Sequence, residues 1–323
     1  MDGFLQITLL ILGFALLIKG ASWLISGASS LASHFKVSKQ LIGLTIVAFG
    51  TGVPEVAIGF SSFITGNTDM LVGDIIGSNI LNTLLLIGIA ATIRPVKINR
   101  TTISKEIPLL LLITLSFAFL FLDTSISGQP LNQVTRSEGL ICLLFFALFL
   151  YYIIAMTKKN RREKKVVEKP KYKVGKSCLL IFLGIASVVL GSAFVVNSAN
   201  EIALALGISD RIIALTVIAL GTSLPDLITT VTAARRGESE LLVGNVIGTS
   251  IFNICIVLGL PVSIFGTITL QNFQILDVIM LIGSAILLWI FARRGSDVTR
   301  REGVLMLLIF AIYNAYIIYG GLL

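Results

Sequence analysis

Residues 41–88 decide the fold and read LIGLTIVAFGTGVPEVAIGFSSFITGNTDMLVGDIIGSNILNTLLLIG. They place the acidic side chain of Glu55 directly after Pro54, within sequence that is apolar enough to enter a bilayer. Ionisable groups are costly inside a membrane and usually serve a function there. The stretch therefore combines a membrane-spanning segment with a candidate polar site.

The same pattern occurs again 171 residues later. Residues 212–259 read IIALTVIALGTSLPDLITTVTAARRGESELLVGNVIGTSIFNICIVLG, and 16 of the 48 positions are identical without a gap. The chain therefore contains an internal duplication. The corresponding polar or proline positions include Glu55 with Asp226, Pro54 with Pro225, Ser78 with Thr249, and Asn82 with Asn253.

The composition excludes a soluble globular protein. Of the 323 residues, 55% are hydrophobic and 13% are charged, and the mean hydropathy is +0.97. The first apolar run leads into further apolar runs, so we interpret it as a spanning helix and not as a cleaved signal. The basic residues lie between apolar runs, which argues against a nucleic-acid-binding face. The three cysteines show no CxxC spacing, so neither a disulfide framework nor a zinc site is indicated.

Ten apolar runs have the length of about 20 residues that a membrane crossing needs. Five lie in each copy, and an odd number of crossings inverts the second copy relative to the first. We expect an all-α membrane protein of ten transmembrane helices in two inverted five-helix repeats, an architecture typical of secondary transporters. The first repeat is expected at 1–157, a basic cytoplasmic loop at 158–176, and the second, inverted repeat at 177–323. The predicted spans are 4–31, 40–64, 71–93, 106–123, 137–157, 177–204, 211–234, 241–264, 274–292 and 303–321.

The basic residues predict the orientation. When the loops are assigned alternately to the two sides, 22 of the 25 Lys and Arg residues fall on one side, ten of them between Lys158 and Lys176. Positive charge marks the cytoplasmic side. We therefore expect a multi-pass protein of the cell membrane with both termini outside. The 158–176 loop is interpreted as a solvated linker, with attraction to anionic lipid headgroups as the alternative.

Each copy carries oxygen-bearing groups beside its proline. A proline lacks the N–H that would use the carbonyl four residues earlier, here at Gly50 and Gly221. The acid that follows shares a helical face with the residues four and seven before it. On the next helix, a hydroxyl and an amide are again four residues apart. These faces comprise Glu55, Thr51 and Ala48; Asp226, Thr222 and Ala219; Ser78 and Asn82; and Thr249 and Asn253.

If the faces of the two copies meet, they form a site whose ligands are all oxygen atoms. Such a site suits hard cations such as Ca²⁺ or Na⁺, whereas transition metals prefer Cys or His ligands. The alternative is that these residues only kink and join helices. That alternative does not account for Glu55 and Asp226, because neither motif contains a Lys or Arg to pair with them.

The paired motifs GTGVPE with GSNILN and GTSLPD with GTSIFN resemble the two alpha-repeats of the cation/calcium antiporter superfamily, of the sodium/calcium exchanger type. The resemblance covers both copies, the ten-helix topology and the central loop. It implies that the protein is not an enzyme but an antiporter that exchanges Ca²⁺ for Na⁺ by alternating access. Both ions are transported, and no cofactor is permanently bound. The implied partners are the lipid bilayer and the two ions, and we expect a monomer to be functional. The implied ligands are Glu55, Thr51, Ser78 and Asn82; Asp226, Thr222, Ser223, Thr249 and Asn253; and the carbonyls of Ala48 and Ala219.

Three positions depart from the family pattern. Gly52 stands where the family often has a serine, and Asn253 stands where microbial and potassium-dependent relatives tend to have an acid. Asp74 occupies a position that is usually asparagine, as Asn245 is in the second copy. Asp74 lies one helical turn before Ser78. We therefore interpret Asp74 as a residue that guides ions to the site without being a core ligand.

Three other functions are compatible with parts of the sequence. In a proton/cation exchanger, Glu55 and Asp226 would release Ca²⁺ by becoming protonated. In an intramembrane aspartyl protease, Asp74 and Asp226 would form a dyad; the repeat instead pairs Asp226 with Glu55. A purely structural membrane protein predicts that Glu55→Gln is harmless.

Overall fold

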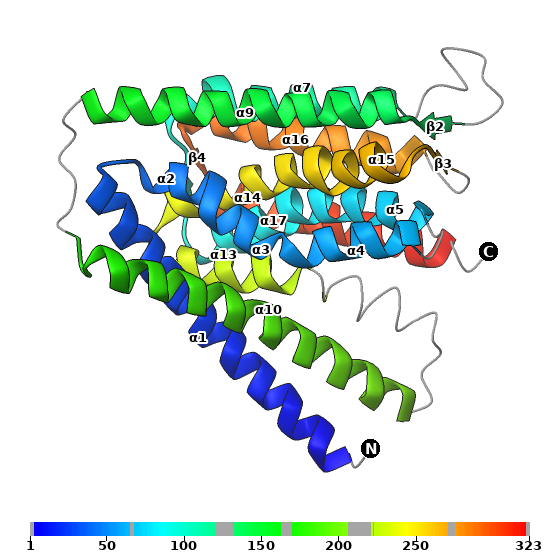
Figure 1. The fold of residues 1–323 in the computed structure, drawn as a ribbon, viewed down its shortest axis with the longest axis horizontal. Coiled ribbons are helices and arrows are strands. Elements are labelled where there is room, and N and C mark those ends of the chain that lie inside the picture. The colour runs from blue at the N-terminus through cyan, green and yellow to red at the C-terminus, as the bar shows by residue number, and fades with distance from the viewer. Residues whose placement is uncertain are drawn as a thin grey trace.

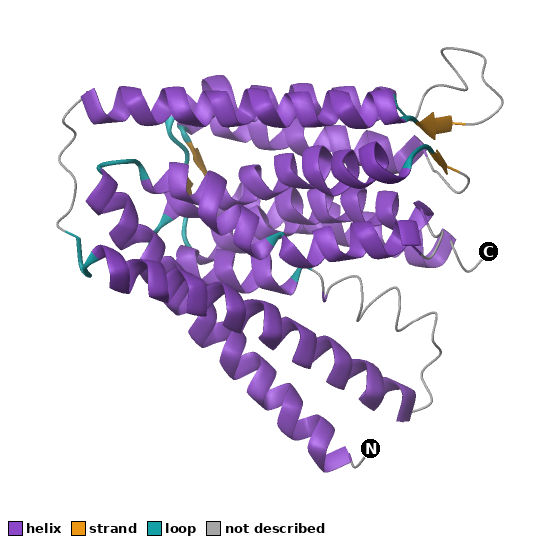
Figure 2. Ribbon diagram, in the orientation of Figure 1, coloured by secondary structure: helices purple, strands orange, loops and turns teal. Residues whose placement is uncertain are grey.

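The chain folds into a bundle of long helices, and its computed structural model describes residues 3–64, 68–120, 132–162, 170–205, 221, 223–270 and 275–320 (Figures 1 and 2). The symbol η denotes a π-helix. The first half comprises α1 (Gly3–Phe35), α2 (Lys39–Ile42), η1 (Gly43–Val47), α3 (Ala48–Thr51), α4 (Val53–Ile64), α5 (Thr68–Ile80), η2 (Leu81–Leu86), α6 (Ile87–Ile93), β1 (Val96–Lys97), η3 (Thr102–Glu106), α7 (Ile107–Phe119), β2 (Asn132–Val134) and α9 (Arg136–Arg162). The second half comprises α10 (Val174–Ala205), α13 (Leu224–Arg236), α14 (Ser239–Phe252), η5 (Asn253–Leu258), α15 (Gly259–Phe265), β3 (Ile268–Leu270), α16 (Ile275–Gly295), β4 (Asp297–Val298) and α17 (Arg300–Gly320).

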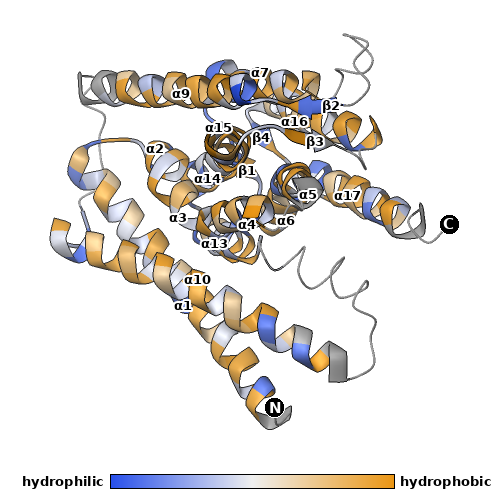
Figure 3. Ribbon diagram, turned by 45° about the vertical axis from the view of Figure 1, so that its right-hand side comes forward, coloured by the Kyte–Doolittle hydropathy of each residue, from blue (hydrophilic) through white to orange (hydrophobic). Residues whose placement is uncertain are grey.

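The predicted all-α membrane fold is confirmed. Among the described residues, seven helices are long and apolar enough to cross a membrane, and α2–α3 with α4 makes an eighth as a bent pair. These eight correspond to eight of the ten predicted spans, and the tenth corresponds to helix α17. The seventh predicted span, 211–234, lies partly outside the described residues. Hydrophobic residues run along most of the helices (Figure 3), and many of them face outward, as a lipid-exposed surface requires.

The first helices of the two halves, α1 and α10, pack closely and antiparallel. A Cβ atom at Gly13 would lie 2.9 Å from the carbonyl oxygen of Gly191, and one at Gly20 would lie 2.9 Å from that of Gly184. The glycines on each helix are seven residues apart, so they return to the same face. The residue numbers rise along α1 as they fall along α10. The corresponding helices therefore run in opposite directions, as inversion demands (Figure 1).

Two short antiparallel sheets connect the halves. In one, Val96 of β1 lies opposite Val298 of β4; in the other, Val134 of β2 lies opposite Ile268 of β3. Each sheet ties the connection after the third span of one half to the connection before the fifth span of the other half. The sequence did not predict these strands, because two or three residues are too few for an alternating pattern.

The fifth span of each half begins with the same helix-capping motif, TRSE at 135–138 and TRRE at 299–302. The backbone N–H of Thr135 donates to Glu138 Oε2 at 2.6 Å, and that of Thr299 donates to Glu302 Oε2 at 2.8 Å. This is the glutamate half of a capping box, which satisfies an N–H that the helix leaves free. The same local device therefore starts both helices.

The arginine of each motif reaches across to the other half. Arg136 donates to the carbonyl oxygen of Ile264 at the end of α15, and Arg300 donates to that of Ile93 at the end of α6, each at 3.4 Å. Ile93 and Ile264 are equivalent positions of the duplication. The two halves thus exchange one contact in both directions, as a pseudo-twofold axis between them requires.

We predict that β1 and β2 lie on opposite sides of the membrane. In a variant lacking Cys142, Cys178 and Cys255, a single cysteine at Lys97 and a single cysteine at Asn132 should react with an impermeant maleimide from opposite sides. The measurement is labelling of right-side-out and inverted membrane vesicles. Labelling of both cysteines from the same side would contradict the inverted arrangement.

Candidate cation-binding site

Glu55 lies at a break in the second span. The α3 helix ends at Thr51, and Gly52 separates it from α4. The segment Lys39–Thr51 and α4 are bent by 45° relative to each other. Pro54 supplies no N–H in the first turn of α4, and Glu55 follows it with only 1% of its surface exposed. Within the described chain, Glu55 Oε2 has no hydrogen-bond partner. A buried carboxylate oxygen of this kind needs positive charge from elsewhere.

Asp226 occupies the equivalent position at the start of α13 and is held by its neighbours. Its Oδ1 accepts a hydrogen bond from Asn245 Nδ2 at 2.9 Å, and Thr249 Oγ1 lies 3.5 Å away. Asn245 and Thr249 are four residues apart on α14 and are fully buried. The Asp226 carboxylate is therefore oriented by the neighbouring helix of its own half.

Asn82 and Asn253 both lie at the start of a π-helical segment, η2 and η5 respectively. Both are buried, and neither amide oxygen nor amide nitrogen has a partner among the residues that the structure describes. Single π-helical turns within α-helices are frequent at functional sites. The duplication thus places two unpartnered amides at equivalent positions.

Helix packing brings these groups together across the halves. The α4 helix, which carries Glu55, packs against η5, and α13, which carries Asp226, packs against η2 and α3. Thr51 Oγ1 lies 3.5 Å from Asn245 Oδ1, a contact between the halves. The Glu55 carboxylate is within electrostatic range of Asp226 and of Asp74. The helix that carries the carboxylate of each half therefore packs against the segment that carries an unpartnered amide of the other half.

Most of the sequence-predicted residues are buried in this region. The structure describes Ala48, Thr51, Glu55, Ser78, Asn82, Ser223, Asp226, Thr249 and Asn253, each 5% exposed or less. Two predicted positions, Thr222 and Ala219, lie outside the described residues.

The carbonyl oxygen of Gly221, which Pro225 leaves without its helical N–H, has a donor from another helix. The Gly221 oxygen accepts a hydrogen bond from Ser192 Oγ of α10 at 2.8 Å. A carbonyl oxygen has two lone pairs, so this bond does not prevent it from accepting a second partner. The contact also joins α10 to the seventh predicted span.

Asn245 lies beside the predicted ligands, although the sequence did not predict it as part of the site. The duplication aligns Asn245 with Asp74 and places it one helical turn before Thr249. This position was the feature of the sequence that could have indicated a role in the site. No periodicity could show that its amide would lie between Asp226 and Thr51.

The donor set limits the chemistry of the site. In the described part of the chain, no three His, Cys, Asp or Glu side chains are grouped closely enough to hold a metal ion. Two carboxylates with hydroxyl and amide oxygens suit a hard cation that is bound reversibly. They do not suit a transition metal, which prefers sulfur or imidazole ligands.

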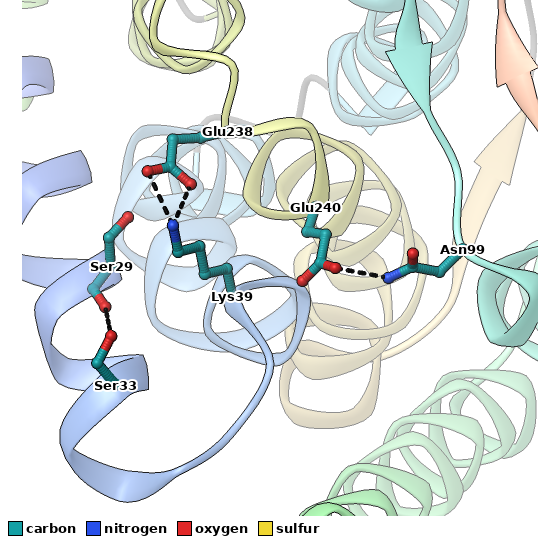
Figure 4. Close-up of polar contacts among 6 residues, drawn as sticks. All are labelled: Ser29, Ser33, Lys39, Asn99, Glu238 and Glu240. Atoms are coloured by element: carbon teal, nitrogen blue, oxygen red, sulfur yellow. Dashed lines mark hydrogen bonds and ion pairs between the residues drawn. The ribbon is translucent and has the colours of Figure 1, made fainter. Parts of the chain in front are cut away.

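Polar contacts join the helices of the site at the end of the bundle that carries the basic loops. Lys39, at the start of α2, forms an ion pair with Glu238 at 3.0 Å, and Asn99 donates to Glu240 of α14 at 3.0 Å (Figure 4). The α2 helix leads through η1 and α3 to Glu55, and α14 leads to Thr249 and η5. These contacts therefore hold together the starts of two helices that carry site residues.

A buried network extends this connection. Gln40 Nε2 donates to Thr102 Oγ1 and to Glu106 Oε2, while Tyr152 donates to Glu106 Oε1 at 2.9 Å. Asn99 donates to Gln40 Oε1 at 3.2 Å. Both oxygens of the buried Glu106 carboxyl have donors, and such a satisfied network gives rigidity. Glu106 therefore differs from Glu55, whose Oε2 has no donor in the described chain.

Comparison with known proteins identifies the family. The model of the sodium/calcium exchanger protein family matches residues 5–155 and 176–319. The chain belongs to the sodium/calcium exchanger family. It is accordingly a cation/calcium antiporter and not an enzyme, and the aspartyl protease alternative is wrong.

Several individual proteins are similar over nearly their full length. "Inner membrane protein YrbG" of Escherichia coli (strain K12) is 34% identical over 94% of this chain and 93% of its own. "Sodium/calcium exchanger MaX1" of Methanosarcina acetivorans is 28% identical over 97% of this chain and 99% of its own. A solved structure of the sodium-calcium exchanger NCX_Mj, soaked with Na⁺ and Sr²⁺, superposes with a TM-score of 0.84 at 30% identity, covering 97% of this chain and 99% of that one.

We predict that Asn245→Ala weakens Ca²⁺ binding by roughly fivefold, because Asp226 loses a donor that orients it. The measurement is calorimetric titration of the purified protein with CaCl₂. Asn314→Ala is the matched control, because that amide only donates to its own helix, at Phe310. Equal affinity of Asn245→Ala and wild type would show that this bond does not position the carboxylate.

Proposed function

We propose that this antiporter exchanges Ca²⁺ for Na⁺ across the cell membrane by alternating access at the site between the inverted halves. The observation that carries the proposal is the pair of buried acids, Glu55 and Asp226, each beside an amide segment of the other half. The similarity to exchangers of sodium and calcium supports the choice of ions. Ca²⁺ and Na⁺ are the cargo, and the chemistry of the site needs no further cofactor.

The proposed ligands divide by charge. Glu55 and Asp226 supply the negative charge, and the neutral groups complete the oxygen shell. The neutral set comprises the side chains of Thr51, Ser78, Asn82, Thr222, Ser223, Thr249 and Asn253, and the carbonyls of Ala48 and Ala219. Asp74, near Glu55 and without a counterpart acid at Asn245, draws cations toward the site through its field.

The charge of the site has an energetic consequence. Two carboxylates and one Ca²⁺ make a neutral complex, whereas more than two Na⁺ leave a net positive charge. A charge that crosses the full membrane field costs or gains about 2.3 kcal/mol per 100 mV. The sodium-loaded step is therefore the one that responds to membrane potential.

The proposal includes the organisation of the chain. Residues 1–157 and 177–323 form the two repeats, and 158–176 is the cytoplasmic loop between them. Both termini lie outside the cell. Because both halves of the site belong to one chain, a monomer is sufficient for transport.

One observation favours a second candidate, proton/cation exchange. Glu55 Oε2 is buried without a donor in the part of the chain that is described, near two other carboxylates. Protonation of Glu55 removes this unfavourable charge and releases a bound cation. In that case, a proton gradient replaces the sodium gradient as the driving force.

We predict that an outward sodium gradient drives Ca²⁺ uptake into proteoliposomes, with at least a tenfold higher initial rate than equal choline. The measurement is uptake of radioactive calcium with sodium-loaded and choline-loaded vesicles at the same pH inside and outside. An outward proton gradient without sodium serves as the control. Uptake that follows the proton gradient and ignores sodium would favour the second candidate.

We also predict that Glu55→Gln and Asp226→Asn each abolish Ca²⁺ transport, because each removes half of the negative charge of the site while nearly preserving its shape. Glu240→Gln is the control, since it retains an acceptor for Asn99 and lies outside the site. Transport by the purified, reconstituted variants is the measurement. A wild-type rate in either acid variant would exclude that acid as a ligand.

A further inference from the structure

Two buried hydroxyl groups follow Asp226 along α13. Thr229 and Thr230 are three and four residues after it, so they lie on the same side of the helix, within one turn. They are 1% and 0% exposed. Neither hydroxyl has a hydrogen-bond partner among the described residues.

Several other hydroxyls in the helices of this protein do have a hydrogen-bond partner. Thr45 donates to the carbonyl of Leu41 at 2.8 Å, and Thr157 donates to that of Ile153 at 2.8 Å. A hydroxyl within a helix commonly makes this bond to the preceding turn. The oxygens of Thr229 and Thr230 are thus available to another ligand, although burying them without one is costly.

The duplication shows that these hydroxyls belong to one half only. The position equivalent to Thr230 is Gly59, where an added Cβ would lie 3.0 Å from the carbonyl oxygen of Val257 in η5. Glycine therefore lets α4 approach the π segment of the other half closely. The equivalent contact in the second half is that of α13 with η2, which contains Asn82. At the equivalent position on α13, the second half has a threonine side chain in place of the glycine.

The direction of α13 gives the hydroxyls a place along the ion route. The helix runs from Asp226 to Arg235 and Arg236, beside the basic-loop end of the bundle. Thr230 is therefore about 6 Å closer to that end than Asp226 is, at about 1.5 Å per residue. Asn82, with an unpartnered amide oxygen in the described chain, lies on the π segment packed against α13.

We propose that Thr229 and Thr230 are additional ligands for Na⁺, on the basic-loop side of Asp226. Neutral hydroxyl oxygens are sufficient for a partly hydrated monovalent cation, whereas Ca²⁺ sites generally include carboxylates. The hydroxyls thus extend the central site in one direction only, toward the side on which α13 ends. The inference rests on the proposed exchange of Ca²⁺ for Na⁺.

The experiment compares Na⁺ dependence from the two sides of the membrane. Ca²⁺ exchange is measured in inverted and in right-side-out vesicles while Na⁺ is varied on the outer face of each. Thr229→Val and Thr230→Val remove only the hydroxyls and should each raise the half-maximal Na⁺ concentration about fivefold on the basic-loop side. On the opposite side, and for Ca²⁺, the change should be less than twofold.

Matched variants separate ligation from structure. Thr230→Ser retains the hydroxyl and should restore wild-type Na⁺ dependence. Thr45→Val is the control, because that hydroxyl donates to Leu41 of its own span. If Thr230→Val does not insert, Thr230→Ala removes the same oxygen with less steric demand and is judged by the same criterion.

The possible outcomes are distinct. Unchanged Na⁺ dependence in both valine variants, or equal weakening from both sides, would overturn the one-sided ligand role. An equal effect on Ca²⁺ and Na⁺ would overturn the assignment to Na⁺. A wild-type protein that shows no sodium-dependent exchange would instead refute the proposed function.

Discussion

The structure depends on two carboxylates that are buried in an apolar bundle. Glu55 and Asp226 are each 1% exposed, and the sequence near them offers no lysine or arginine. Isolated charges at such depth are unstable unless something compensates them. The protein provides amides, hydroxyls and a broken helix around them, and in the proposed function the transported cation supplies the positive charge. A site of this kind is stable with a cation bound and is readily reset by a different cation.

The inverted duplication places this unstable pair at the centre of the molecule. The same contacts are made in both directions, by the Gly-lined pairing of α1 with α10, by the two cross-half sheets, and by Arg136 and Arg300 on the helix ends of the opposite half. None of these contacts involves the site. They allow the halves to be held as one unit while the helices that carry the acids remain interrupted and therefore easier to rearrange.

Local sequence patterns predicted the fold, because each pattern indicates a structural feature without knowledge of the neighbouring segments. Hydrophobic runs predicted the spans, and their odd number in each copy predicted the inversion. The gapless alignment of Glu55 with Asp226 predicted the centre of the candidate site. The strands, the arginine contacts and the π segments could not be predicted, since they depend on which chain segments meet in space. Asn245 and the Ser192 bond to Gly221 belong to the same class, because a single helix pattern carries no information about a neighbour's hydrogen bonds.

The departures from symmetry carry the remaining functional information. A perfectly symmetric site would have the same ion affinity toward both sides of the membrane. In this chain, however, Asp74 corresponds to Asn245, and Gly59 corresponds to Thr230. The acid lies near Glu55, whereas the amide donates to Asp226. The glycine allows one close helix contact, whereas the threonine adds a buried hydroxyl to the other half. The first difference gives an acidic side chain to one half only, and the second gives a hydroxyl to the other half only. Because the shared fold imposes equal geometry on both ends, side-specific ion affinity has to arise from such substitutions.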